Sequence, residues 1–159
     1  MAAVDFFLKI DSIDGESLDS KHKGEIELES FSFGATQTGT LATGGAGAGK
    51  VQFQDFHFVT KTSKASPKIF AACASGKHII KATIIARKAG EQPREYLKIT
   101  LSDVLISSYS VNGDGIVGAV DSSGMAFMKI DYAFTPQTDT GAAGTPVSIG
   151  WDVKANRAV

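Results

Sequence analysis

Cysteine is almost absent from this sequence, and so is an excess of charge of either sign. Cys73 is the single cysteine, so an intrachain disulfide is impossible and synthesis in a reducing compartment, the cytoplasm, is expected. Lys and Arg number 16 and Asp and Glu number 17, for a formal net charge of -1. Because nucleic-acid binding draws its affinity from a basic surface, this balance predicts no nucleic-acid partner.

Long hydrophobic runs are also missing. Apolar runs such as Met125–Met128 fall far short of the roughly 18–20 residues that a membrane-spanning helix needs, so no membrane insertion is expected. Charge at Asp5 interrupts the N-terminus before the apolar segment of a secretory signal could form. The 159 residues, 43% of them hydrophobic, still suffice for one continuous core, which predicts a single domain over residues 1–159.

Apolar and polar residues alternate along most of the chain, with many β-branched and aromatic side chains, which predicts a mainly β fold. Clusters of Gly, Asp, Asn and Pro between the alternating segments are typical of antiparallel strands joined by turns. Seven strands in one domain indicate a sandwich or a barrel. The predicted strands are Val4–Ile10, Glu25–Phe33, Val51–Thr60, His78–Lys88, Tyr96–Tyr109, Met125–Phe134 and Val147–Lys154.

Three of these strands change the phase of their alternation partway along. In the second strand, Ile26 and Leu28 share one face, whereas Phe31 and Phe33 have the opposite parity. A bulge or a twisted residue at each change bends a sheet toward closure, so we predict a small bent β-barrel of antiparallel strands. The changes are expected near Glu29–Ser30, Gln54–Asp55 and Ser102–Asp103.

One segment predicts a helix that flanks the barrel. Ser66 can cap it, Pro67 suits its first position, and Gly76 can adopt the left-handed conformation just past Lys68–Ser75. About nine residues are too few for a helix to persist alone, so packing against the sheet must hold it. The apolar stripe expected to make that contact comprises Ile69, Phe70, Cys73 and Ala74.

Several short motifs imitate catalytic or ligand sites. Gly44–Lys50 has the spacing of a phosphate-binding loop, but Val51 replaces the required hydroxyl residue and a strand, not a helix, is predicted to follow. Ser110–Asp121 resembles a calcium loop without helical flanks, so a hairpin turn is the better interpretation. Ser20–Lys23 matches Ser-x-x-Lys but lies in a charged turn without partner motifs.

The remaining reactive side chains form no site pattern either. His22, His57 and His78 are far apart in sequence, and we interpret each as a surface or strand residue. Cys73 lacks a neighbouring cysteine, and we expect it to pack on the helix face. No catalytic residue, metal site or cofactor is therefore predicted, and the chain is not expected to be an enzyme.

A long glycine-rich arm separates the second and third predicted strands, roughly from Ala35 to Lys50, and an excursion of this size is usually functional. The order and spacing of eight stretches between Val4 and Val153 resemble the Hcp family, the haemolysin-coregulated tube proteins of bacterial type VI secretion. These stretches are His22–Ile26, Phe31–Gly34, Gly47–Val51, Lys64–Lys68, Ala72–His78, Arg87–Gly90, Glu95–Ile99 and Gly150–Asp152.

The resemblance implies a β-barrel with one flanking helix that assembles into homohexameric rings. Stacked rings would form an inner tube, inside sheath proteins and behind a tip spike of the valine-glycine repeat type, and would carry secreted effectors in the lumen. The chain would assemble in the cytoplasm and be secreted without a signal peptide, with no C-terminal toxin domain. An Hcp-like accessory or effector-binding module that builds no tube wall is the alternative.

The resemblance also implies two groups of functional residues. The arm would reach a neighbouring subunit or ring. Ser32, whose parity points it away from Phe31 and Phe33, would face the lumen and contact cargo. The arm residues in question are Thr40, Leu41, Gly44, Gly45, Gly47, Gly49 and Lys50.

Overall fold

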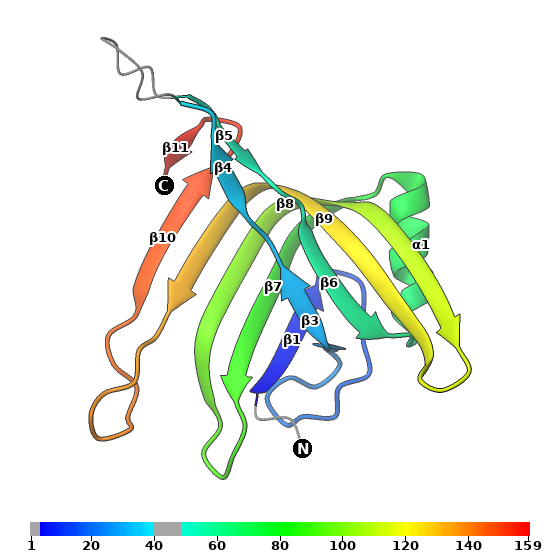
Figure 1. Ribbon diagram of the computed structural model, residues 1–159, viewed down its shortest axis with the longest axis horizontal. Coiled ribbons are helices and arrows are strands. Elements are labelled where there is room, and N and C mark those ends of the chain that lie inside the picture. The colour runs from blue at the N-terminus through cyan, green and yellow to red at the C-terminus, as the bar shows by residue number, and fades with distance from the viewer. Residues whose placement is uncertain (1–3, 40–48) are drawn as a thin grey trace.

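The computed structural model describes residues 4–39 and 49–159, and within them the chain is a curled antiparallel sheet with one helix on its flank (Figure 1). The elements in chain order are β1 (Val4–Ile10), β2 (Ile26–Leu28), β3 (Ser30–Ser32), β4 (Ala35–Gln37), β5 (Val51–Phe53), β6 (Phe56–Lys61), α1 (Ser66–Ser75), β7 (His78–Lys88), β8 (Arg94–Asp114), β9 (Gly118–Phe134), β10 (Val147–Asp152) and β11 (Arg157–Ala158). The predicted mainly β class is confirmed, and β1 and β7 have the predicted bounds.

The larger sheet wraps around the core without closing completely. Its strands lie in the order β11-β10-β9-β8-β7-β1-β2, and β6 pairs with β9 on one side and with β3 on the other. Because β2 and β3 are consecutive, they nearly complete the circuit: β3 pairs with β6, whereas only single bonds join β2 and Glu29 to β6. The Glu29 N–H donates to the Val59 carbonyl over 2.8 Å, and Thr60 Oγ1 donates to the Glu27 carbonyl over 2.8 Å. The barrel is bent as predicted, but it is not closed by a continuous ladder.

Two of the predicted phase changes are strand breaks. β2 ends at Leu28 and β3 begins at Ser30, so Glu29 separates them. Likewise β5 ends at Phe53 and β6 begins at Phe56. In both places the chain leaves one strand partner and joins another, so the predicted bulge is a change of partner.

The third phase change is a kink that crosses three neighbouring strands. Asp103 has a φ of 53°, in the left-handed region, and the two residues that flank Ser102–Asp103, Leu101 and Val104, are both buried on the core side. The same three-residue step between buried side chains occurs in β7 and β9, at Ile79/Ala82 and Phe127/Ile130. The sheet therefore turns along one line, and its inner face stays apolar above and below that line.

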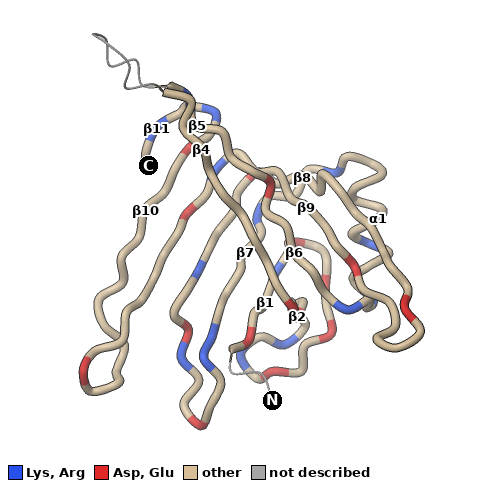
Figure 2. Tube along the Cα trace, in the orientation of Figure 1, with Lys and Arg blue, Asp and Glu red and all other residues tan. Residues whose placement is uncertain are grey.

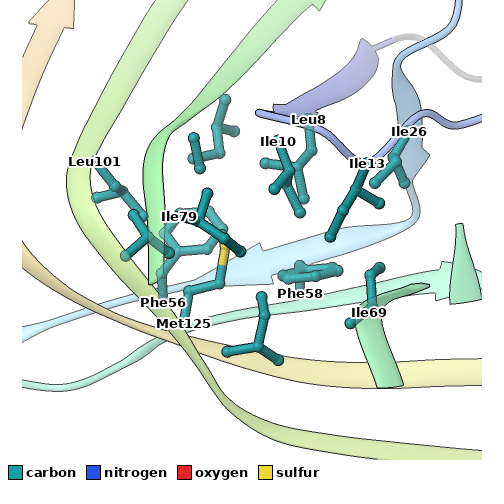
Figure 3. Close-up of a cluster of buried hydrophobic side chains, with 14 of the residues drawn as sticks. Leu8, Ile10, Ile13, Ile26, Phe56, Phe58, Ile69, Ile79, Leu101 and Met125 are labelled. Carbon is teal, nitrogen blue, oxygen red and sulfur yellow. The ribbon is translucent and has the colours of Figure 1, made fainter. Parts of the chain in front are cut away.

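Aliphatic and aromatic side chains from every wall of the curled sheet meet in one core (Figure 3). Phe56 and Phe58 are completely buried at its centre. The Phe31 and Phe33 rings stack on Phe56 with centroids 5.4 and 6.2 Å away. Phe31 and Phe33 are themselves half-buried, so β3 lies at the margin of the core.

The helix α1 closes part of this core, but it begins differently from the prediction. It begins at Ser66 itself, behind Ala65, and no side chain caps it, while Gly76 ends it with a φ of 65° as predicted. Ile69 is completely buried, whereas Phe70 is 58% exposed, so the apolar stripe is narrower than expected. The helix has 10 residues, and no described helix is long and apolar enough to cross a membrane.

A buried carboxylate explains why Ser66 does not cap the helix. The Ser66 hydroxyl donates to Asp121, which is completely buried on β9, and Thr62 Oγ1 donates to the same carboxylate over 2.7 Å. Burial raises the pKa of the nearby Tyr109 hydroxyl, and the Asp121 charge and hydrogen bond add to that effect. Hydroxyl groups around Asp121 thus tie the start of α1 to the β8–β9 hairpin.

Replacing Phe56 by alanine should lower the free energy of unfolding by ~3–5 kcal/mol, because it empties a fully buried site on which two other rings stack. Urea unfolding followed by circular dichroism measures the change. Phe70→Ala is the matched control, since the same truncation on an exposed helix face should cost far less. Equal losses in both variants would mean that Phe56 is not the centre of the core.

Candidate functional site

The root of the glycine-rich arm is an ordered hairpin, although the sequence predicted no structure there before Val51. β4 and β5 form a two-stranded antiparallel sheet of their own, and Thr38 with Lys50 extends it. Thr38 Oγ1 donates to the Lys50 carbonyl over 3.0 Å and accepts from the Lys50 N–H over 3.1 Å. We call β4, β5, Thr38 and Lys50 the stalk. At its base, the Phe53 ring meets Phe127 edge-on at 5.6 Å, which fixes the stalk to the core.

Only part of the predicted arm set can be placed. Lys50 is exposed at the outer end of the stalk. A Cβ on Gly49 would lie 2.1 Å from the Gly39 nitrogen, so the two chains of the stalk approach too closely for a side chain there. The remaining predicted arm residues lie outside the described residues; they are Thr40, Leu41, Gly44, Gly45 and Gly47.

Ser32 belongs to a broad hydroxyl-rich face on the outside of the curled sheet. Its neighbours Phe31 and Phe33 pack on the core, while Ser32 itself is exposed, so its orientation away from that pair is as the parity indicated. The strand registers align Ser32, His57, Gly124 and Ser108 in one row across four strands. Directly opposite residues share a face, so the row lies on the side of Ser32, and its three side chains are exposed whereas Gly124 is buried.

A second row extends this face. Ser30, Val59, Ser122 and Ser110 are aligned across the same four strands, and the serines among them are exposed. Within the first row, a Cβ on Gly124 would come within 2.6 Å of Ser108 Oγ, so β8 and β9 approach closely there. We call the two rows the hydroxyl face; its exposed polar members are Ser30, Ser32, His57, Ser108, Ser110 and Ser122.

A strip of apolar side chains on the inner face of the sheet has no cover from the described chain. The register pairs Val147 with Phe134 and Ile149 with Tyr132, which places all four on one face. The buried neighbour Ile99 lies opposite Tyr132, so this face is the one that lines the core. Yet Tyr132 and Phe134 are 43% and 44% exposed, and Val147 and Ile149 are 64% and 68% exposed. We call these four residues the apolar strip.

The apolar strip is not isolated from the core. The Tyr132 ring lies 5.8 Å from Phe33, at the margin of the buried cluster, and Phe134 meets Tyr96 at 6.5 Å. The apolar surface therefore continues from the core onto β9 and β10. The sequence predicted these strands, but it did not indicate which of their apolar side chains the chain leaves uncovered.

A cluster of charged side chains fastens the loop between β1 and β2 to the outer face of β1. Arg87 is buried on β7, and its two terminal nitrogens donate to Asp19 over 2.9 and 2.8 Å, while Nη2 also donates to Asp5 over 3.1 Å. Hydrogen bonding to Arg87 lowers the pKa of Asp19 to about 2. The Arg87 guanidinium also lies over the Phe7 ring, 4.8 Å from its centroid.

His22 extends this cluster, and we call Asp5, Asp19, His22 and Arg87 together the clasp. The environment of His22 differs from the prediction. The sequence indicated a surface or strand histidine, whereas His22 is a buried loop residue that is 4% exposed. Its Nδ1 lies 3.0 Å from Glu25 and its Nε2 lies 2.7 Å from Glu95, and its ring stacks on Phe7 at 4.3 Å. The charged turn around Ser20–Lys23 therefore contains a structural clasp, a contact that no local motif signals.

Similarity to known proteins agrees with this architecture. The family model described as "Type VI secretion system effector, Hcp" matches residues 7–134. Protein hcp1 of Pseudomonas aeruginosa is 41% identical over 158 residues, covering 97% of this chain and 98% of that protein. The chain belongs to the Hcp family. The description of the family places it in type VI secretion.

Solved structures of Hcp proteins match the fold along its whole length. The crystal structure of Hcp1 from Salmonella typhimurium superposes with a TM-score of 0.83 at 35% identity, covering 99% of this chain and 100% of that one. A type six secretion system protein superposes with a TM-score of 0.92 at 26% identity, with the same coverage of both chains. The curled sheet and its flanking helix are thus the Hcp fold.

The motifs that imitated other sites lie in ordinary strands and turns of this Hcp chain. Lys50 leads into the strand β5 rather than a helix. Ser110–Asp121 spans the turn of the β8–β9 hairpin, as predicted, and Asp114 Oδ1 accepts from the Ile116 N–H over 2.6 Å within that turn. Cys73 is half-buried against the core. No group of three or more potential metal ligands occurs among the residues the structure describes.

The clasp should make the stability of this protein depend on acid pH. Because the pKa of Asp19 is about 2 in the folded chain and ~3.9 in an unfolded one, unfolding takes up protons as the pH falls. The stabilisation by Asp19 is complete above about pH 4 and is lost as the pH falls toward about 2. In Asp19→Asn, urea midpoints should be lower at neutral pH and should fall less steeply between those limits.

Asp139→Asn is the control for this measurement, because Asp139 is an exposed carboxylate in the loop after β9. Its pH profile should follow that of the unmodified chain. If Asp19→Asn does the same, the bond to Arg87 does not stabilise the fold.

Proposed function

We propose that this Hcp chain is the structural subunit of a type VI inner tube and that six copies close into a ring. The apolar strip carries the proposal, together with membership of the family. A contiguous apolar surface that continues from the core is costly to leave in water, and surfaces of this kind mark protein–protein contacts. Because tube proteins assemble with copies of themselves, a second copy of the same chain is the partner that we expect to cover the apolar strip.

Ring closure requires a heterologous contact. In a cyclic assembly each subunit offers one surface to one neighbour and a different surface to the other. The apolar strip lies on β9 and β10, toward the β11 side of the sheet. It therefore supplies one of the two surfaces, and the neighbour covers it with another part of its own wall.

In the proposed tube, each of the other surfaces faces a different partner. The hydroxyl face is assigned to the lumen, where Ser32 and its neighbouring serines offer hydrogen bonds to secreted effectors. The arm, including Thr40, Leu41, Gly44, Gly45 and Gly47, is assigned to contacts with a neighbouring subunit or ring. A sheath would surround the stacked rings and a spike protein would sit at their tip. Rings would assemble in the cytoplasm and be expelled by sheath contraction.

The mass of the purified protein tests the ring. Size-exclusion chromatography with light scattering should give about 100 kDa, six times the chain mass of 16.7 kDa. Ile149→Lys should shift the protein toward smaller species, because it places a charge in the apolar strip. Ser148→Lys is the matched control, since the adjacent side chain points to the opposite face and should leave the ring intact.

Two results would contradict the ring. A strict monomer at high concentration would favour an accessory or effector-binding module that builds no tube wall. A hexamer that is unaffected by Ile149→Lys would mean that the apolar strip does not lie in the ring contact.

A further inference from the structure

Polar contacts, rather than apolar ones, hold the loop between β1 and β2 against the rest of the chain. We call residues 14–25 of this loop the strap; charged residues of both signs occur along it (Figure 2). Leu18 is the only apolar side chain of the strap, and it is 88% exposed. The buried side chains of the strap are those of Ser17 and His22. Because no apolar side chain anchors the strap, its few polar bonds decide whether it stays closed.

Two charged contacts fasten the strap to different strands of the sheet. Asp19 accepts hydrogen bonds of 2.9 and 2.8 Å from Arg87 on β7, and His22 Nε2 lies 2.7 Å from Glu95 on β8. Glu16 makes a further, exposed bond of 3.1 Å to a backbone N–H just before α1. The backbone hydrogen bonds within the strap join it only to itself. The His22 contact is therefore one of two charged fasteners.

Carboxylates face both nitrogens of the His22 ring. Nδ1 lies 3.0 Å from Glu25, and Nε2 lies 2.7 Å from Glu95. Because an ionised carboxylate can only accept, both hydrogen bonds form only when both ring nitrogens carry hydrogen, as in the imidazolium cation. A neutral ring would donate from one nitrogen and turn the lone pair of the other toward a carboxylate. The closed geometry of the strap thus belongs to the charged ring.

The charged groups around His22 also favour a positive ring. Its ring stacks on Phe7 at 4.3 Å, and the Arg87 guanidinium lies 4.8 Å from the centroid of the same Phe7 ring. Four carboxylates and one guanidinium gather in this cluster, so an imidazolium ion reduces an excess of negative charge. These groups are Asp19 and Glu25 on the strap, Glu95 on β8, Asp5 on β1 and Arg87 on β7. The two strap lysines that flank His22, Lys21 and Lys23, are exposed.

We propose that His22 is a proton-operated fastener, whose charged form keeps the strap closed and whose neutral form lets the strap open beside Glu95. Histidine in an open segment loses its proton near pH ~6.5, so closure has this contribution in full below that pH and loses it as the pH rises further. Opening uncovers Phe7, which is 2% exposed in the closed state. The device belongs to the single chain and does not depend on the proposed tube.

The second fastener does not respond in the same pH range, which makes the opening local. The pKa of Asp19 is about 2, mainly because of its hydrogen bonds to Arg87, and an arginine stays charged throughout. Around neutral pH the strap therefore remains bound at Asp19 while it loosens around His22.

Amide hydrogen exchange measures this opening, when each rate is divided by the intrinsic exchange rate at the same pH. Protection of the strap amides should fall by about tenfold from pH 6 to pH 8.5, whereas the amides of β7 should keep theirs. His22→Gln cannot carry the charge and should show the low strap protection at both pH values. Equal protection at the two pH values in the unmodified chain overturns the proposal.

His78→Gln is the control for these measurements. The His78 side chain is 64% exposed and pairs with Asp103, away from the strap. This variant should keep the full pH response of the strap. Loss of the response in His78→Gln would assign it to the wrong histidine and overturn the proposal.

Two further measurements do not depend on whether His22→Gln folds. Nitrogen NMR of the unmodified chain at pH 6 should find hydrogen on both ring nitrogens of His22, whereas a ring buried without charged partners would be neutral. Glu95→Gln keeps the histidine but removes one carboxylate, so strap protection should be lost at a pH about one unit lower. A neutral ring at pH 6, or an unchanged transition in Glu95→Gln, overturns the proposal.

Discussion

The apolar inner face of the sheet extends beyond the core that it encloses, and the rest of the structure depends on this excess. β8 and β9 run for 21 and 17 residues, and the buried cluster occupies only part of their inner surface. Near the ends of β9 and β10, Tyr132 and Ile149 continue that surface into solvent. Since the helix and the hydroxyl-rich wall already surround the core, the described chain has no further element for this region. Association between copies is the simplest physical way to cover it.

The bends that leave this surface uncovered also separate the other surfaces. At Asp103 the three central strands turn together, which keeps Leu101 and Val104 on the same inner side. At Glu29 the chain changes partner and exposes the serines of β3 and its neighbours on the outer side. A flat sheet could not enclose a core and still offer an apolar inner strip and a hydroxyl outer face in one small wall. Curvature is thus what assigns each surface to a separate partner in the proposed tube.

The sequence predicted the parts of this fold that rest on local alternation and turn chemistry. β1 and β7 were predicted with their bounds, and Gly76 ended the helix as expected. The failures involve contacts between distant residues. Ser66 does not cap α1 because Asp121, 55 positions away, binds its hydroxyl, and His22 is buried because Glu95 reaches it from β8. The apolar strip was not predicted for the same reason. Alternation shows which side chains share a face, but it does not show which of them the rest of the chain leaves exposed.

The apolar character of the proposed ring contact suits the closure of a ring. An apolar contact gains stability from buried area, is little affected by salt, and can hold a ring together permanently. In a cyclic assembly each copy offers one surface to one neighbour and receives the other neighbour on a second surface, so all contacts are satisfied once the rotation closes. In the proposed ring, the apolar strip thus drives the association of single chains, and closure ends it.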